Sequence, residues 1–256
     1  MINRSHKTTQ MNALYLDIGN TSLKLAVPEE DGWKVLWHQR FENDFVSFID
    51  LLKESSDSEK NVVYTSSVRK DITRKVEEAV PGLHIQVLSA SQIPKQFINY
   101  STIHTLGLDR FLGCLGAFKV SNKSGVIVID TGSACTVDFM DKDGIYQGGV
   151  IMPGMDILKK SIRRYLPELP DVDSTVPDTW PGKSTQDSLR LGVNGMFGLA
   201  IESWIGKFQM MDDNAVVFIT GGNSMEIQLL LNDTECTHHV NLQFEGMKEF
   251  VEKMKG

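Results

Sequence analysis

The sequence lacks any apolar run that approaches the roughly 20 residues needed to span a bilayer. Its first stretch, MINRSHKTTQ, lacks the apolar core of a secretory signal peptide. Cysteine is scarce, and Cys114, Cys135 and Cys236 are odd in number, widely spaced and free of any CxxC pair. This pattern indicates neither a disulfide framework nor a zinc ribbon. We therefore expect a cytoplasmic protein.

The chain also lacks an excess of positive charge. Its formal net charge is -7, which makes a general nucleic-acid-binding surface a poor expectation, because neutralising phosphates requires clustered Lys and Arg. The hydrophobic share of 41% and the charged share of 23% are ordinary for a globular protein and argue against disorder or a coiled coil. A length of 256 residues indicates one large domain or two smaller ones packed together.

The first third of the chain alternates strand and helix patterns. Two apolar segments surround a tight turn, and further strand and helix patterns follow one another. This alternation predicts an α/β fold with a mostly parallel sheet and helices packed on it. The expected strands cover 12–17, 22–27, 32–41, 61–68 and 84–90, and the expected helices cover 43–54 and 69–80.

The centre of the chain repeats the opening pattern. An apolar run ends on Asp17 in LYLDIGNTSLKLAV, and another ends on Asp130 in VIVIDTGSACTVDF. In both segments a glycine stands two residues after the aspartate, and small or hydroxyl residues and a second strand follow it. We interpret this as one architectural unit used twice, which predicts two related halves. Further on, 155–166 and 186–211 have helical patterns, 215–223 is an expected strand, and a proline-rich loop covers 167–185.

The turn after Asp17 is a candidate anion site. Backbone N–H groups in such a turn can form an anion-binding concavity, and Thr21 and Ser22 add hydroxyl donors. Asp17 could hold a hydrated Mg²⁺ that bridges phosphate oxygens. An ordinary hairpin explains the stretch equally well when it is taken alone. The second copy at Asp130 and the glycine-rich strand end at 220–222 favour nucleotide binding.

Four motifs carry a specific family resemblance: DIGNTSLK (17–24), GLDR (107–110), DTGSA (130–134) and YQGGVIMPG (146–154). In this order and spacing they resemble the type III pantothenate kinases, a branch of the acetate kinase/sugar kinase/Hsp70/actin superfamily. The resemblance covers about residues 12 to 225. It implies an α/β fold of two ribonuclease-H-like halves with a nucleotide cleft between them. We expect a flexible extension at 1–11 and halves at 12–118 and 119–256.

The resemblance also implies an activity, the ATP-dependent phosphorylation of pantothenate to 4′-phosphopantothenate, the first step of coenzyme A biosynthesis. In the family, the residue matched by Asp109 is the base that accepts the proton of the pantothenate hydroxyl. The cofactors implied are ATP with Mg²⁺ and a monovalent cation, K⁺ or NH₄⁺. The family also implies a homodimer whose substrate site is completed across the interface.

The residues implied by the resemblance fall into three groups. Matches to the ATP site are Asp17, Ile18, Gly19, Asn20, Thr21, Ser22, Leu23, Lys24 and Ser133, the last at a position where the family usually has threonine. Matches to the pantothenate site are Tyr100, Gly107, Leu108, Asp109, Arg110 and Thr185, with Thr185 coming from the partner subunit. Matches to cation ligands are Asp130 for the monovalent cation and Asp17 for Mg²⁺ through water. Ile103 departs from the proline that many members have between the tyrosine and the GxDR motif.

The chemistry of the GLDR stretch agrees with these roles. The stretch GLDRFLGCLGAF reads as a helix with Asp109 and Arg110 in its first turn, where a helix favours anions. Arg110 can add a charge-assisted contact to a carboxylate or a phosphoryl group. Taken without the other motifs, Asp109 and Arg110 would be an ordinary surface pair at a helix start.

Two other functions remain as alternatives. One is a kinase of the same superfamily that acts on a sugar or a short carboxylate, which should lack GxDR with an upstream tyrosine. The other is a non-enzymatic accessory factor for transcription, which should have lost the base or the hairpin. Tyr100 and the stretch Gly107–Arg110 argue against the first alternative. The presence of Asp17, Asp109, Arg110 and Asp130 argues against the second.

Overall fold

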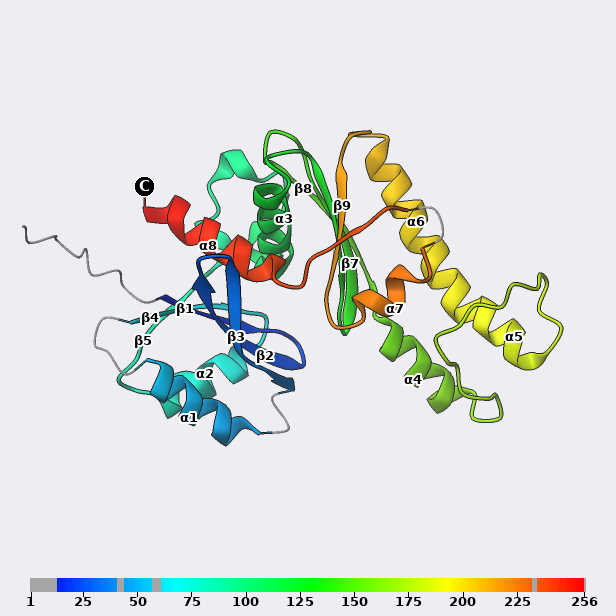
Figure 1. The fold of residues 1–256 in the computed structure, drawn as a ribbon, viewed down its shortest axis with the longest axis horizontal. Helices are drawn as coiled ribbons and strands as arrows, with labels where there is room; N and C mark the ends of the chain where they lie inside the picture. The colour runs from blue at the N-terminus through cyan, green and yellow to red at the C-terminus, as the bar shows by residue number, and fades with distance from the viewer. Residues whose placement is uncertain (1–12, 41–43, 57–60, 232–233, 256) are drawn as a thin grey trace, which may run out of the picture. The chain divides into compact units, whose positions relative to one another are not determined.

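The computed structural model describes residues 13–40, 44–56, 61–231 and 234–255, so the extension predicted at 1–11 lies outside the described residues. The chain divides into two compact units, one ending at Ser89 and the other beginning at Ala90 (Figure 1). The division falls earlier than the predicted boundary at 118. The reason is that helix α3 (Leu108–Val120) packs along helix α8 (Leu242–Lys255) and against the second sheet.

The first unit is a five-stranded mixed sheet with the strand order β3-β2-β1-β4-β5. Strands β1, β2 and β3 form an antiparallel meander, and β4 and β5 continue the sheet in parallel with β1. The bounds are β1 Ala13–Ile18, β2 Ser22–Glu29, β3 Gly32–Arg40, β4 Val62–Ser67 and β5 His84–Val87, with helices α1 Phe45–Ser55 and α2 Lys70–Ala79.

The alternation of β1 directs alternate side chains to the helix-covered core and to the opposite face of the sheet. Leu14, Leu16 and Ile18 are buried in one cluster with Phe48 of α1 and Val76 of α2. Successive side chains of a strand point to opposite faces of the sheet. Asp17 therefore lies on the other face from this core. The strand pattern that the sequence shows is thus also what directs the aspartate away from the helices.

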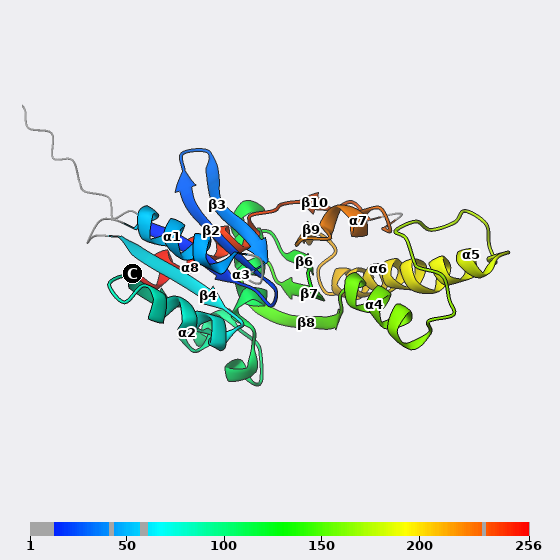
Figure 2. The ribbon, with the colours of Figure 1, turned by 90° about the horizontal axis from the view of Figure 1, so that it is seen from below.

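The second unit repeats the first strand for strand. Its sheet has the order β10-β9-β6-β7-β8, with β6, β7 and β8 antiparallel in sequence and β9 and β10 parallel to β6 (Figure 2). Asp17 and Asp130 occupy the same position, one residue before the end of β1 and of β6. This confirms the predicted fold class of two related halves. The bounds are β6 Val126–Thr131, β7 Ala134–Met140, β8 Tyr146–Pro153, β9 Val216–Thr220 and β10 Thr237–His238.

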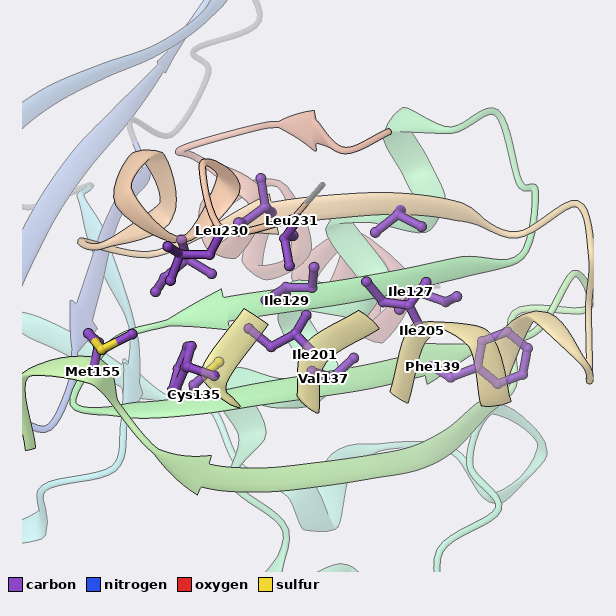
Figure 3. Packing of buried hydrophobic residues seen from close by; sticks show 14 of the residues in the cluster. Ile127, Ile129, Cys135, Val137, Phe139, Met155, Ile201, Ile205, Leu230 and Leu231 are labelled. Carbon is purple, nitrogen blue, oxygen red and sulfur yellow. The ribbon is translucent and has the colours of Figure 1, made fainter. Parts of the chain in front are cut away.

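Helices cover both faces of the second sheet. On one face, Ile201 and Ile205 of α6 pack against Ile127, Ile129 and Val137 (Figure 3). On the other face, α3 contacts β6 and β7. The helix predicted at 186–211 is in fact α5 (Thr185–Arg190), a π-helical turn (Leu191–Gly195) and α6 (Met196–Gln209); the remaining helices are α4 Met155–Tyr165 and α7 Ser224–Gln228, with 3-10 turns at Ala90–Gln92, Lys95–Phe97 and Ile103–Thr105. Within the described residues, no helix has the length and apolarity that crossing a bilayer demands.

Two glycines allow α3 and α8 to approach closely. A β carbon on Gly246 would overlap the carbonyl oxygen of Leu112, and one on Gly116 would overlap that of Leu242. Both obstacles are backbone atoms, which cannot rotate aside. The backbones of the two helices thus come into contact at Leu112 and Gly116, within the two turns of α3 that follow Asp109.

We expect Gly246→Ala to destabilise the protein by about 1–3 kcal/mol, because overpacking against backbone forces the helices apart. Gly206→Ala is the matched control, since Gly206 also lies in a helix and a β carbon there meets nothing within 4 Å. This control should be neutral or stabilising by up to about 1 kcal/mol, the helix propensity gain. Thermal unfolding of both variants tests the contact, and equal melting temperatures would contradict it.

Candidate functional site

The β1–β2 turn presents polar groups next to a carboxylate and an ammonium. Asp17 is paired in register with Lys24 of β2 and with Ser66 of β4, so these three side chains share the face of the sheet that lies opposite the core. The turn is closed by the Gly19 N–H, which donates to the Ser22 carbonyl at 3.0 Å. Thr21 at the tip is exposed. The arrangement suits an anion held near a cation.

Arg69, which the sequence reading missed, braces this turn. Its Nη1 donates to the Asn20 carbonyl at 3.0 Å, and its Nε and Nη2 donate to Asp71 at 2.9 and 2.7 Å. The hydrogen bonds from Arg69 lower the pKa of Asp71 to about 2. No local signal identifies Arg69, because it lies far along the chain from the turn that it contacts.

The ends of three strands meet at Asp130 in the second unit. Thr131 donates from Oγ1 to the Thr220 carbonyl at 2.9 Å, and Gly154 donates its N–H to the Ser133 carbonyl at 2.9 Å. Gly221 has a φ of +95°, and a β carbon there would come within 2.6 Å of Asp130 Oδ1. Glycine at this position therefore lets the β9 end lie directly against the aspartate.

The β1–β2 turn and the strand ends at Asp130 could each offer a cation one protein carboxylate. Among the residues that the structure describes, no group of three or more His, Cys, Asp or Glu side chains is arranged to bind a metal ion. A Mg²⁺ ion usually keeps several waters and takes one or two carboxylates together with substrate phosphates. The single carboxylate of Asp17 fits that mode. Asp130 likewise offers a single carboxylate, at the end of β6 and beside Gly221.

The first turn of α3 holds a half-buried carboxylate. Asp109 is the second residue of the helix, and its Oδ1 accepts the Arg110 N–H at 3.0 Å. Burial raises the pKa of Asp109 above its ordinary value; the Arg110 N–H opposes this rise, and the nearby charge of Asp138 adds to it. A carboxyl group with a raised pKa is a better proton acceptor than a free aspartate.

Arg110 forms a buried ion pair with Asp138 of β7. Its Nη2 lies 2.6 Å from Asp138 Oδ1, its Nε lies 3.1 and 3.2 Å from the two carboxylate oxygens, and the side chains are 8% and 2% exposed. Tyr146 donates its hydroxyl to Asp138 Oδ1 at 2.8 Å. Burial works against the Arg110 charge, but Asp138, and to a smaller extent Tyr146 and Tyr100, raise the pKa of Arg110. Asp109 and Arg110 are therefore not an ordinary surface pair.

Tyr100 reaches the same cluster through the segment before it. Ile98 forms a parallel bridge with Tyr146, and the Asn99 N–H donates to the Tyr146 carbonyl at 2.8 Å. The Tyr100 and Tyr146 rings lie 6.1 Å apart between centroids. In the structure Tyr100 thus lies beside the GLDR motif, with Ile103 where many family members have a proline.

Comparison with known proteins decides the family. The family model for type III pantothenate kinase matches residues 13–207. The chain belongs to the type III pantothenate kinase family. It is 30% identical over 224 residues to the type III pantothenate kinase of Flavobacterium johnsoniae, covering 86% of this chain and 90% of that one.

Solved structures show the fold that this kinase family shares with others. A Campylobacter jejuni protein assigned to the Baf family of transcriptional activators superposes with a TM-score of 0.62 at 21% identity, covering 94% of this chain and 98% of that one. The ROK hexokinase of Thermus thermophilus superposes with a TM-score of 0.51 at 11% identity, covering 96% and 100%. At such low identity these likenesses establish the two-sheet kinase fold and no more.

In this member of the pantothenate kinase family, Thr185 lies away from the other candidate residues of the second unit. It is the first residue of α5, and Ser184 caps that helix by accepting the Asp187 N–H at 3.1 Å. Both views place α5 at the far end of the second unit from α3, which carries Asp109 (Figures 1 and 2). One chain therefore does not bring Thr185 to Asp109.

Asp138 is a second residue near the candidate site that the sequence alone did not reveal. A signal was present, because an aspartate interrupts the apolar strand ACTVDFM. Buried charges are almost always paired. The sequence analysis assigns Arg110 to a ligand carboxylate or phosphoryl group and does not pair it with this aspartate.

Proposed function

We propose that this chain transfers the γ-phosphoryl group of ATP to the primary hydroxyl of pantothenate, the first step of coenzyme A biosynthesis. Membership of the type III pantothenate kinase family carries this proposal. The half-buried Asp109–Arg110 start of α3 supports it, because a proton acceptor and an anion-binding group stand side by side there. We place the reaction in the cytoplasm, in keeping with the free thiols of Cys114, Cys135 and Cys236.

Asp109 acts in this proposal as the base. Phosphoryl transfer has a loose transition state, so the base orients the hydroxyl and takes its proton late. The raised pKa of Asp109 brings its basicity closer to that task. Gly107 and Leu108 position the carboxylate at the helix start, where N–H groups also favour an anionic acceptor. Tyr100 and Arg110 contact the rest of pantothenate.

The nucleotide binds along the β1–β2 hairpin in this proposal. Backbone and hydroxyl donors of the turn hold the phosphates, Lys24 adds charge, and Asp17 binds Mg²⁺ through water. When bound, the metal neutralises charge that develops on the phosphoryl oxygens. Ser133 also contacts ATP, and Asp130 binds K⁺ or NH₄⁺. The proposed contacts of the hairpin run over the whole segment Asp17–Lys24.

We also propose a homodimer in which each substrate site is completed by Thr185 of the partner. The position of α5 far from α3 within one unit supports this arrangement. Several apolar side chains of α6 and the preceding loop are exposed in the single chain, which suits an interface between copies. They are Trp180, Met196 and Leu199.

The test of the proposed function is the acceptor dependence of ATP consumption. The purified chain, with Mg²⁺ and K⁺, should form ADP with pantothenate at a rate at least about 100-fold above that with no acceptor, or with glucose or acetate, given that kinases turn over at about 1–100 per second. Mass spectrometry should detect 4′-phosphopantothenate. Preference for glucose or acetate would overturn the assignment in favour of another kinase of this fold.

A further inference from the structure

The Arg110–Asp138 pair raises a question about how a buried, paired arginine also serves a substrate. The guanidinium group is planar and carries five N–H donors in a fixed fork. Asp138 takes the edge formed by Nε and Nη2. The other edge, formed by Nη1 and the remaining Nη2 hydrogen, points away from Asp138 because the fork is rigid. Tyr100, a proposed pantothenate contact, is among the groups hydrogen-bonded to Arg110.

We propose that Asp138 is a positioning residue, held in place by Tyr146, that fixes Arg110 so that its outer edge receives the carboxylate of the acceptor. This inference rests on the proposed function and deepens it, because it assigns a specificity device to the same site. The guanidinium group then binds two carboxylates, that of Asp138 through Nε and Nη2 and that of the ligand through Nη1 and the remaining Nη2 hydrogen. Bidentate pairing of this kind gives geometric selectivity for a carboxylate.

The residues around Asp138 hold its carboxylate in a single orientation. Tyr146 donates to Oδ1 from β8, and Tyr146 is itself fully buried. Gly149 is the register partner of Asp138, and a β carbon there would overlap Asp138 Oδ1. The missing side chain at Gly149 is thus what makes room for the carboxylate. A carboxylate so confined holds the arginine rigidly.

Stability alone is a weak reason for such a pair. Buried ion pairs are often no more stabilising than well-packed apolar residues of similar volume, because two charges lose their hydration. Preorganisation offers a better account. A free arginine loses much rotamer freedom when it binds a ligand, whereas an arginine that the fold has already immobilised does not. Asp138 should therefore contribute to pantothenate affinity and leave ATP affinity unchanged.

The experiment is a double-variant cycle on Arg110→Gln, Asp138→Asn and the pair together, with KM measured separately for pantothenate and ATP. We expect Asp138→Asn to lower kcat/KM for pantothenate by about 100-fold, chiefly through KM, as truncating one partner of a buried charge pair does. The KM for ATP should change by less than about twofold. The double variant should be no less active than Arg110→Gln alone, because Asp138 acts only through Arg110.

Thermal unfolding separates positioning from mere stabilisation. Asp138→Asn leaves a buried guanidinium unpaired and should lower the melting temperature. The double variant buries two neutral groups, so it should regain most of that temperature without regaining pantothenate affinity. Tyr146→Phe removes the hydrogen bond to Asp138 but keeps the Arg110–Asp138 ion pair, so this variant should still fold. We expect it to raise KM for pantothenate by about 10-fold, the effect of losing a hydrogen bond to a charged group. Glu78→Gln, which breaks the exposed pair with Arg74, should change nothing.

Three outcomes would overturn this inference. They are additive losses in the cycle, parallel losses of ATP and pantothenate affinity, and a double variant that regains affinity together with stability. Any of these in a chain that phosphorylates pantothenate would leave the proposed function standing. A wild-type chain with no activity on pantothenate would overturn both.

Discussion

Asp109→Asn is expected to lower the turnover of pantothenate by about 10²–10⁴-fold, the usual contribution of general acid–base catalysis. Asparagine keeps the shape of the side chain and can still accept the Arg110 N–H, but it cannot accept the proton of the hydroxyl. The measurement is ADP formation with saturating ATP and pantothenate. Asp213→Asn, the same change at an exposed loop position, is the control and should keep full activity.

The same variant should be more stable than the parent at neutral pH. Burial raises the pKa of Asp109 in the folded protein, so between the ordinary aspartate pKa and the raised value the folded state binds more protons than the unfolded state. Stability contributed by this group therefore falls as pH rises through that window. The asparagine side chain carries no charge, so the melting temperature of the Asp109→Asn variant at pH 7 should exceed that of the parent.

The catalytic pH profile of the parent should show the same group. Because the base must be deprotonated, kcat/KM for pantothenate should fall as the pH is lowered through a pKa that lies above that of a free aspartate. Loss of activity in Asp109→Asn together with a lowered melting temperature would contradict this account, because the inactivity could then be attributed to unfolding.

Mixing two inactive variants is expected to restore activity, if each site combines Asp109 of one subunit with Thr185 of the other. Asp109→Asn and Thr185→Arg should each be nearly inactive as homodimers, the second because a long charged side chain enters the acceptor site. In a mixed dimer, one of the two sites has both native residues. Refolding an equimolar mixture should recover about a quarter of the parent activity, since half of the dimers are mixed and each has one intact site.

The control for this mixture is a pair of variants on the same side of the site. Asp109→Asn mixed with Arg110→Gln should recover nothing. Asp109 and Arg110 of one site come from the same chain, so each site of a mixed dimer lacks either the native Asp109 or the native Arg110. Recovery in that mixture, or none with Thr185→Arg while both proteins remain dimeric by light scattering, would contradict the shared site.

The position of Thr185 in that experiment depends on how its loop is held. Asn194, buried in the π-helical turn, donates from Nδ2 to the carbonyls of Asp173 and Thr175 at 2.8 and 2.7 Å. Arg190 of α5 also pairs with Asp173. These contacts attach the proline-rich loop to the helix that begins at Thr185. The loop is therefore a fixed support of α5.

Features with local signals were predicted from the sequence, and features that depend on distant contacts were not. Asp17 and Asp130 were placed correctly at strand ends because each follows an apolar alternation and precedes a glycine turn. The brace by Arg69 and the pairing of Asp138 with Arg110 were missed, because each joins segments far apart in the chain.

The difference between the predicted boundary at 118 and the observed division after Ser89 also comes from a contact between distant segments. The pattern of α3 identifies a helix, but it does not reveal which sheet the helix covers. That depends on Gly116 and on Gly246 of α8, more than a hundred residues later, where the two backbones meet. The π-helical turn at Leu191–Gly195 was likewise missed, because the apolar period continues through it.

The strand-for-strand match of the two sheets has a consequence for how the second one can grow. Val126 pairs with Val216, whereas the equivalent residues Ala13 and Val62 are much closer in sequence, because α4, the proline-rich loop, α5 and α6 lie between β8 and β9. Closing a longer connection costs only about 0.6 kcal/mol for each doubling of its length. The parallel pairing of β6 and β9 therefore tolerates a large insertion at small entropic expense. In evolutionary terms, this crossover is the place where one half of a duplicated fold can acquire new surfaces while its sheet remains unchanged.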